Sequence, residues 1–121
     1  MIGNYIPWSG YEPYIRHCNA RTVNISTHLH VAIMFTDDQK RRQQLIKWMD
    51  RMDAFTSIVR RSLIQLHRGE YLNPIEKVNI EKFYIVLVSA IEESPDKNYL
   101  EQFEPELAQI MNIFLTALKK A

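Results

Sequence analysis

The chain has 121 residues, of which 46% are hydrophobic and 24% are charged, and its net charge is +1. This length fits one domain, and the balance of charged and apolar residues excludes an intrinsically disordered protein. The single cysteine, Cys18, excludes an internal disulfide framework and favours a reducing compartment. No secretory signal and no apolar run long enough to span a bilayer are visible, so we expect a cytoplasmic protein outside the membrane.

The charges are distributed unevenly along the chain. Residues 37–68 hold eight Lys or Arg against four Asp, which gives +4, whereas residues 69–106 hold nine Asp or Glu against three Lys, which gives −6. Basic and acidic helices could attract each other within the molecule. The basic segment could instead offer a face to nucleic acid or to an acidic partner. We favour the first interpretation and keep the second.

Residues 1–14 differ from the rest of the chain, and we expect them to form an extended arm. An aromatic residue occurs at every third position, and Pro7, Gly10 or Pro13 precedes each of the last three. A polyproline II segment has three residues per turn, so this spacing would line the rings along one edge. The arm could fold over the protein's own core or dock on a neighbouring subunit or partner. The aromatic residues are Tyr5, Trp8, Tyr11 and Tyr14.

The segment from Ile15 to Phe35 fits two secondary structures. As a helix, it has a heptad-like seam with residues at alternating spacings of three and four. As a β-strand, residues 21–35 alternate between apolar and polar positions and are rich in β-branched residues. A lone long strand needs a partner strand, and no second alternating segment occurs in the chain, so we predict a helix. The residues of the helical seam are Ile15, Cys18, Thr22, Ile25, Leu29 and Ala32.

The clearest predicted helix covers residues 37–68. Thr36 and Gln39 fit a capping box at its start, and Arg68 followed by Gly69 fits a last turn with a left-handed stop. Its apolar residues recur at spacings of three and four, which indicates an amphipathic helix. They are Leu45, Trp48, Met49, Met52, Phe55, Val59, Leu63 and Leu66.

A third helix is predicted to begin at Asn73, an N-cap residue that is followed by Pro74 at the first helical position. The sequence Ser94-Pro95-Asp96 ends it. The run from residue 83 to residue 88 is apolar almost all round, which predicts a helix buried on several sides or a short strand. The apolar members of this helix are Ile75, Val78, Phe83, Val86, Leu87, Ala90 and Ile91.

A fourth helix carries apolar residues in heptad phase between Leu100 and Ala117. Pro105 marks either its first turn or a kink. Four amphipathic helices with short connections predict an all-α fold, an antiparallel four-helix bundle. We expect one helical domain over residues 15–121, preceded by the extended arm of residues 1–14.

No catalytic, metal or cofactor site is expected. His28 and His30 would share a face only on a strand, and the histidine spacings of helical metal sites are absent. Cys18 lies beside His17, but no strained turn presents its thiol as a nucleophile. No glycine-rich loop for phosphate occurs either. We therefore expect a protein that is not an enzyme and binds no cofactor.

The predicted helix over residues 37–68 has a basic face opposite its apolar seam. Five cations lie within an arc of about 100° on a helical wheel, although Asp50 interrupts the arc and Asp53 borders it. Phosphate binding favours a continuous positive stripe, so this one is diluted. The five cations are Lys40, Lys47, Arg51, Arg61 and Arg68.

The apolar arc of the same helix is wider than the roughly 100° stripe that a simple bundle needs. Ile46 and Ile64 lie on one side of its centre, and Ile58 lies on the other. The arm, another helix or a second subunit must cover the excess surface, and we expect a second subunit. The residues predicted to contact partners are Tyr5, Trp8, Tyr11, Tyr14, Ile46 and Ile64.

These patterns predict a non-enzymatic interaction module, a self-associating adaptor or scaffold that forms a homo-oligomer and binds another protein. The alternative is an accessory protein that binds nucleic acid through the basic face. The two hypotheses differ in how binding depends on salt, because phosphate contacts release counterions.

Overall fold

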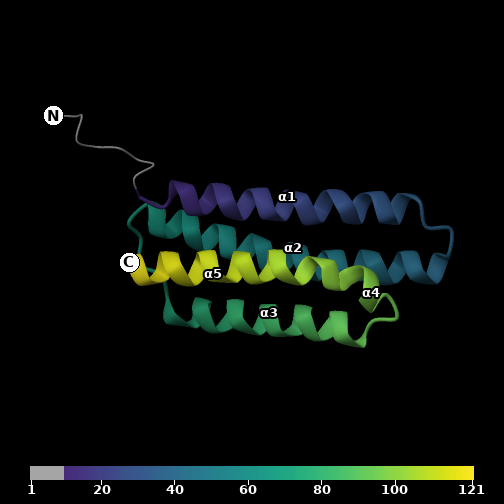
Figure 1. Cartoon of the computed structure of the whole chain (residues 1–121). Helices are drawn as coiled ribbons and strands as arrows, with labels where there is room; N and C mark the ends of the chain where they lie inside the picture. The colour runs from purple at the N-terminus through teal and green to yellow at the C-terminus, as the bar shows by residue number, and fades with distance from the viewer. Residues whose placement is uncertain (1–9) are drawn as a thin grey trace.

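The computed structural model describes residues 10–121 and shows an all-α bundle, which confirms the predicted fold class (Figure 1). Successive long helices run antiparallel, with α2 and α5 in the middle and α1 and α3 at opposite edges. A short helix and a 3₁₀ turn lead into the last long helix. The elements are α1 (Glu12–Met34), α2 (Gln39–His67), α3 (Pro74–Glu93), α4 (Lys97–Leu100), η3 (Glu101–Phe103) and α5 (Glu104–Lys120).

The segment that fitted either a helix or a strand is a helix, α1. Cys18, Ile25 and Leu29 are fully buried on one face of it, as the helical spacing predicts. No residue in the described part of the chain lies in a strand, so the alternative of a strand over residues 21–35 is wrong. The helix prevails because a face with a period of 3.6 residues can pack against both α2 and α5.

α1 begins earlier than the predicted domain boundary at residue 15. Pro13 lies in its first turn, where the fixed φ of proline suits a helix, and Tyr11 is the N-cap residue. Tyr14 is therefore helical and does not belong to an extended arm. Tyr5 and Trp8, the other aromatic residues of the predicted arm, lie outside the described residues.

α2 matches its predicted range closely, but a different residue caps it. The Asp38 carboxylate accepts hydrogen bonds from the backbone N–H groups of Lys40 at 3.0 Å and Arg41 at 3.4 Å. Thr36 is buried and donates its hydroxyl to the carbonyl of Ala32 in the last turn of α1. The predicted capping box is therefore wrong, because Thr36 ends the preceding helix and only Asp38 faces the start of α2. The predicted stop is confirmed, since Gly69 has a φ of +74°.

α3 begins as predicted, with Asn73 Oδ1 accepting a hydrogen bond from the Ile75 N–H at 3.0 Å. Its buried residues are Ile80, Leu87 and Ile91. Four of the predicted apolar members are 39% to 55% exposed, so the expectation of burial on several sides is wrong. The reason is position: α3 lies at an edge of the bundle and packs mainly against α2, so a single face is covered. The exposed members are Ile75, Val78, Phe83 and Val86.

All four long helices contribute to one apolar core. The Trp48 ring stacks on the Phe103 ring with centroids 5.9 Å apart, and its indole N–H donates to the Leu87 carbonyl at 3.4 Å. These contacts join α2 to α3 and to the η3 turn. Pro105 lies in the first turn of α5, which decides between the two roles considered for it.

A substitution at Phe55 tests the packing of the core, because its side chain is fully buried and the centre of its ring lies 5.9 Å from that of the Tyr84 ring of α3. We expect Phe55→Ala to lower the free energy of unfolding by about 3–5 kcal/mol, since it leaves a cavity. Phe35→Ala is the matched control, because Phe35 is 78% exposed and should change that free energy by less than about 0.5 kcal/mol. Urea denaturation measures both, and equal losses would contradict the packing.

Candidate interaction surfaces

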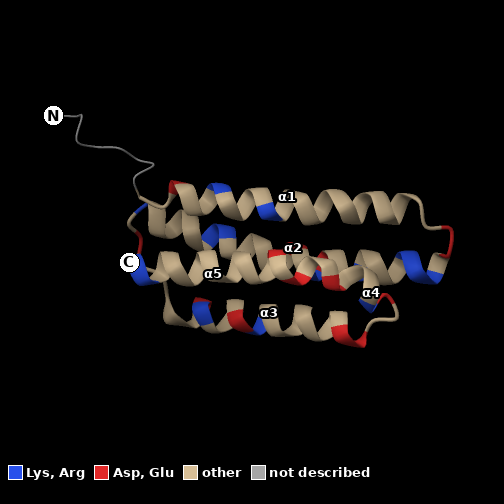
Figure 2. Ribbon diagram, viewed as in Figure 1, with Lys and Arg blue, Asp and Glu red and all other residues tan. Residues whose placement is uncertain are grey.

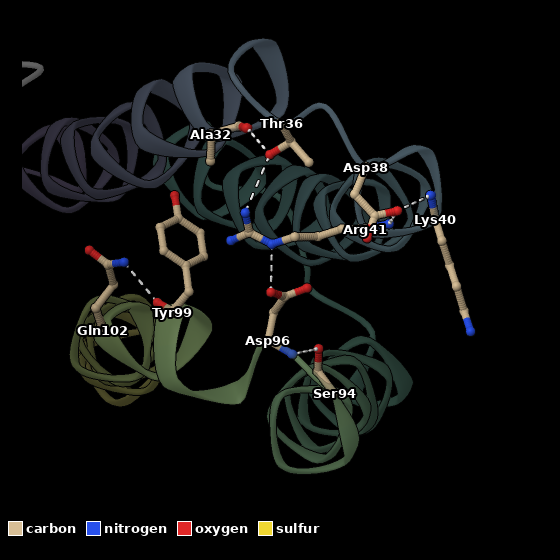
Figure 3. A network of polar contacts seen from close by, with 9 residues as sticks. All are labelled: Ala32, Thr36, Asp38, Lys40, Arg41, Ser94, Asp96, Tyr99 and Gln102. Atoms are coloured by element: carbon tan, nitrogen blue, oxygen red, sulfur yellow. Dashed lines mark hydrogen bonds and ion pairs between the residues drawn. The ribbon is translucent and has the colours of Figure 1, made fainter.

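A polar cluster at one end of the bundle joins the α1–α2 turn to the α3–α4 turn (Figure 3). Arg41 Nε donates to Asp96 Oδ1 at 2.6 Å, and Arg41 Nη1 donates to Thr36 Oγ1 at 3.5 Å. The Arg41 guanidinium carbon also lies 5.9 Å from the centre of the Tyr99 ring. Ser94 Oγ accepts the N–H of Asp96 at 3.0 Å, which holds this carboxylate in place.

The groups of this cluster satisfy one another. The Arg41 charge meets the Asp96 carboxylate and the face of the Tyr99 ring, and Tyr99 donates its hydroxyl to the His28 carbonyl at 3.1 Å. Burial raises the pKa of Tyr99, and the Arg41 charge opposes that rise. We assign the cluster a structural role, since it holds two chain reversals together.

The histidines and the cysteine of residues 10–121 form no metal-binding or nucleophilic group. The Nδ1 atoms of His28 and His30 donate to carbonyls one turn earlier, those of Asn24 at 2.7 Å and Ser26 at 2.8 Å. Cys18 is fully buried, and burial raises the pKa of its thiol, which disfavours a thiolate. Within the described range, no three His, Cys, Asp or Glu side chains could together hold a metal ion.

The five cations of the predicted basic face are all exposed, but they do not form one continuous positive stripe. Arg61 Nη2 lies 3.7 Å from Glu76 Oε2 on α3. Lys47 and Arg51 line a groove next to Asp50. Lys40 lies in the first turn of α2 and Arg68 is its C-cap, so these two cations are at opposite ends of the helix. The Arg61–Glu76 pair joins the basic helix to the acidic part of the chain.

Tyr11 and Tyr14, which we expected to contact a partner, are half-buried and pack against the chain's own core. The Lys120 ammonium lies 5.4 Å from the centre of the Tyr11 ring and 5.8 Å from that of Tyr14. The backbone N–H of Tyr11 donates to His67 Nδ1 at 3.3 Å. For these two rings, the structure therefore matches the interpretation in which the segment folds over its own bundle.

The wide apolar arc of α2 is largely covered within the chain. α1, α3 and α5 all pack against this helix, and Ile58 lies against the core. Ile46 and Ile64, the other predicted contact residues, are half-buried. Other helices of the same chain thus cover the apolar arc of α2, where we expected a second subunit to do so.

The sequence patterns did not predict two exposed apolar surfaces that the structure shows. One is the outer face of α1, where Val23, Val31 and Met34 are 61%, 51% and 72% exposed. The sequence contains a signal for this surface, because no Asp, Glu, Lys or Arg occurs from Thr22 to Thr36. The other surface is on α3 and opens into the groove against α2, where Phe83 and Val86 are 39% and 51% exposed.

The polar cluster gives a prediction about stability. Arg41→Gln should lower the free energy of unfolding by about 1–3 kcal/mol, because it leaves the half-buried Asp96 carboxylate without its ion pair. Lys40→Gln is the matched control at the adjacent exposed position and should change that energy by less than about 0.5 kcal/mol. Thermal or urea denaturation measures both, and a neutral Arg41→Gln would show that the cluster does not clamp the two turns.

No described helix is long and apolar enough to cross a membrane. The chain was compared with models of protein families, with curated proteins and with solved structures, and none of these comparisons finds a match. The exposed surfaces of the bundle are therefore the basis on which a function can be proposed.

Proposed function

We propose that this protein is a non-enzymatic helical interaction module that self-associates through the outer face of α1. The supporting observation is a solvent-exposed helix face without charge. From Thr22 to Thr36 the chain has no Asp, Glu, Lys or Arg, although one side of this segment is open to solvent (Figure 2). A helix that stays in solvent normally carries charged residues on its outer side.

The exposed face has the spacing of a helix-packing seam. Its five residues lie at intervals of three, four, four and three, within an arc of about 80° on the helix surface. This arc lies opposite the buried face that contains Cys18, Ile25 and Leu29. α1 thus has one apolar face toward its own bundle and a second one toward solvent. The residues of the second face, here called the α1 face, are Ala20, Val23, Thr27, Val31 and Met34.

A second copy of the chain suits the α1 face. A two-fold contact sets the same patch of both copies together, so charges near the axis would meet like charges. Charged residues are depleted from interface cores for a related reason, the cost of removing them from water. The charges of the first half of α1 are paired within the molecule: Arg16 with Glu12 at 3.1 Å, and Arg21 with Glu106 at 3.5 Å. The α1 face itself contains no charged residue and is left for contact with the other copy.

Lipid and nucleic acid fit the surfaces less well. Helices that lie on membranes combine large apolar residues with Lys or Arg, whereas the α1 face is flanked by Asn24, His28 and His30. Nucleic-acid binding through α2 remains the alternative, but Arg61 is paired with Glu76 and Asp50 interrupts the stripe. No observation of the structure favours it over self-association.

The α1 face predicts a concentration-dependent homodimer that a single charge disrupts. Burial of one valine side chain contributes about 1.5 kcal/mol, and a two-fold interface counts it twice. Val23→Glu should therefore weaken self-association about 100-fold. Ile85→Glu is the matched control, because Ile85 and Val23 are both 61% exposed but lie on α3 and α1. Sedimentation equilibrium of both variants and the unchanged protein measures the dissociation constants.

Three results of this experiment would contradict the proposal. The first is an unchanged protein that stays a 14.4 kDa monomer at about 100 μM. The second is dissociation by Ile85→Glu but not by Val23→Glu, which would move the interface to α3. The third is binding to lipid vesicles that Val23→Glu abolishes, which would make the α1 face a membrane surface. Far-UV circular dichroism shows in each case whether the variant keeps its helices.

A further inference from the structure

A groove between α2 and α3 is a second surface, separate from the α1 face. Its volume is about 510 Å³, and both helices contribute to its walls. The two helices that line it are antiparallel neighbours (Figure 1). Its residues are Lys47, Asp50, Arg51 and Ala54 of α2 with Asn79, Lys82, Phe83 and Val86 of α3.

The groove has an apolar floor that α3 leaves uncovered. Ala54 is exposed on the α2 side, and Phe83 and Val86 are 39% and 51% exposed on the α3 side. A smaller hollow of about 190 Å³ continues it toward Pro95 and shares Lys47 and Arg51 with it. An exposed aromatic ring in a groove is typical of sites that anchor a partner's side chains.

The sides of the groove carry unpaired positive charge. Lys47, Arg51 and Lys82 line it against one carboxylate, Asp50, and Glu93 borders the adjoining hollow. No ion pair joins any of these three cations to another residue in the described part of the chain. Arg61, farther along α2, does pair with Glu76 at 3.7 Å. The cations of the groove are thus left for a partner.

We propose that this groove binds an acidic amphipathic helix of another protein. The apolar side of that helix covers Ala54, Phe83 and Val86. Its carboxylates pair with Lys47 and Arg51 on one flank and with Lys82 on the other. From residue 79 to residue 93, where α3 ends, the groove and its continuation span about 21 Å along the helix, which accommodates roughly four turns of helix. This is the helix-in-groove mode of recognition, with charge deciding between partners.

The other occupants fit less well. A second copy docking symmetrically would set this patch, with its three cations Lys47, Arg51 and Lys82 and its one carboxylate, against the same patch of like charge. A nucleic acid would pair with the cations but would leave most of the apolar floor without a complementary surface. Since α1 and α3 lie at opposite edges of the bundle, a helix in the groove leaves the α1 face free (Figure 1). Both surfaces together would make the protein an adaptor.

A designed peptide tests the groove on the whole 121-residue chain. The probe is a fluorescein-labelled peptide of about 18 residues, with leucine along one helical face and glutamate on both flanks. Its control carries glutamine in place of every glutamate. In fluorescence anisotropy we expect the acidic peptide to bind at least about tenfold more tightly than the control, with an affinity that falls as salt rises.

Protein variants locate the binding. Ala54→Trp fills the floor and should abolish binding of the acidic peptide. Lys47→Glu with Lys82→Glu should weaken it about tenfold or more. The matched control, Lys77→Glu with Lys119→Glu, makes the same charge change at exposed positions that do not line the groove, and should leave affinity within about twofold. Circular dichroism confirms that each variant keeps its helices.

Three outcomes would overturn the groove proposal. The acidic and glutamine peptides could bind equally, or neither could bind at about 100 μM. A single-stranded oligonucleotide could compete with the peptide and still bind to Ala54→Trp, which would assign the cations to phosphate. Failure here is distinguishable from failure of self-association, because Val23→Glu alters the dimer on α1 and should leave peptide affinity unchanged.

Discussion

The arrangement of the bundle follows from one constraint: the apolar arc of α2 is wider than one neighbouring helix can cover. Leu45, Phe55 and Leu63 are among its buried residues, and α1, α3 and α5 all pack against it. Covering this arc places α2 in the middle of the bundle beside α5, with α1 and α3 at the edges. An edge helix has one face covered and one face open, so the position of α2 in the bundle creates the two exposed apolar surfaces.

The basic residues of α2 have two roles: some form ion pairs within the bundle, and others face solvent. Arg41 with Asp96 and Arg61 with Glu76 join the basic α2 to the acidic second half of the chain. Lys47 and Arg51 lie on the same helix but face an apolar groove, with Asp50 as the one carboxylate among the residues that line it. The same helix therefore contributes both intramolecular ion pairs and the charge that we propose selects a partner.

The sequence predicted the helices well because their signals are local. Asn73 followed by Pro74, and Gly69 with its positive φ, begin and end helices by the chemistry of a few adjacent residues. The prediction from local sequence was wrong at Thr36. Its hydroxyl donates a hydrogen bond to a carbonyl of α1, and Asp38 caps α2 instead. For the surfaces, the charge-free stretch from Thr22 to Thr36 was present in the sequence, but its apolar residues could be assigned to an exposed face only once α1 was known to have an open side.

The sequence by itself determined the all-α class, the approximate helix boundaries and the buried faces of α1 and α2, because periodicity and capping act within a few turns. Tertiary structure decided which apolar residues stay exposed. Phe83 and Val86 belong to an apolar run that predicts burial on several sides, yet α3 lies at an edge and leaves them open. It also decided that Lys47 and Lys82 share one groove. These residues lie on different helices, and only the packing of those helices brings side chains so distant in the sequence together.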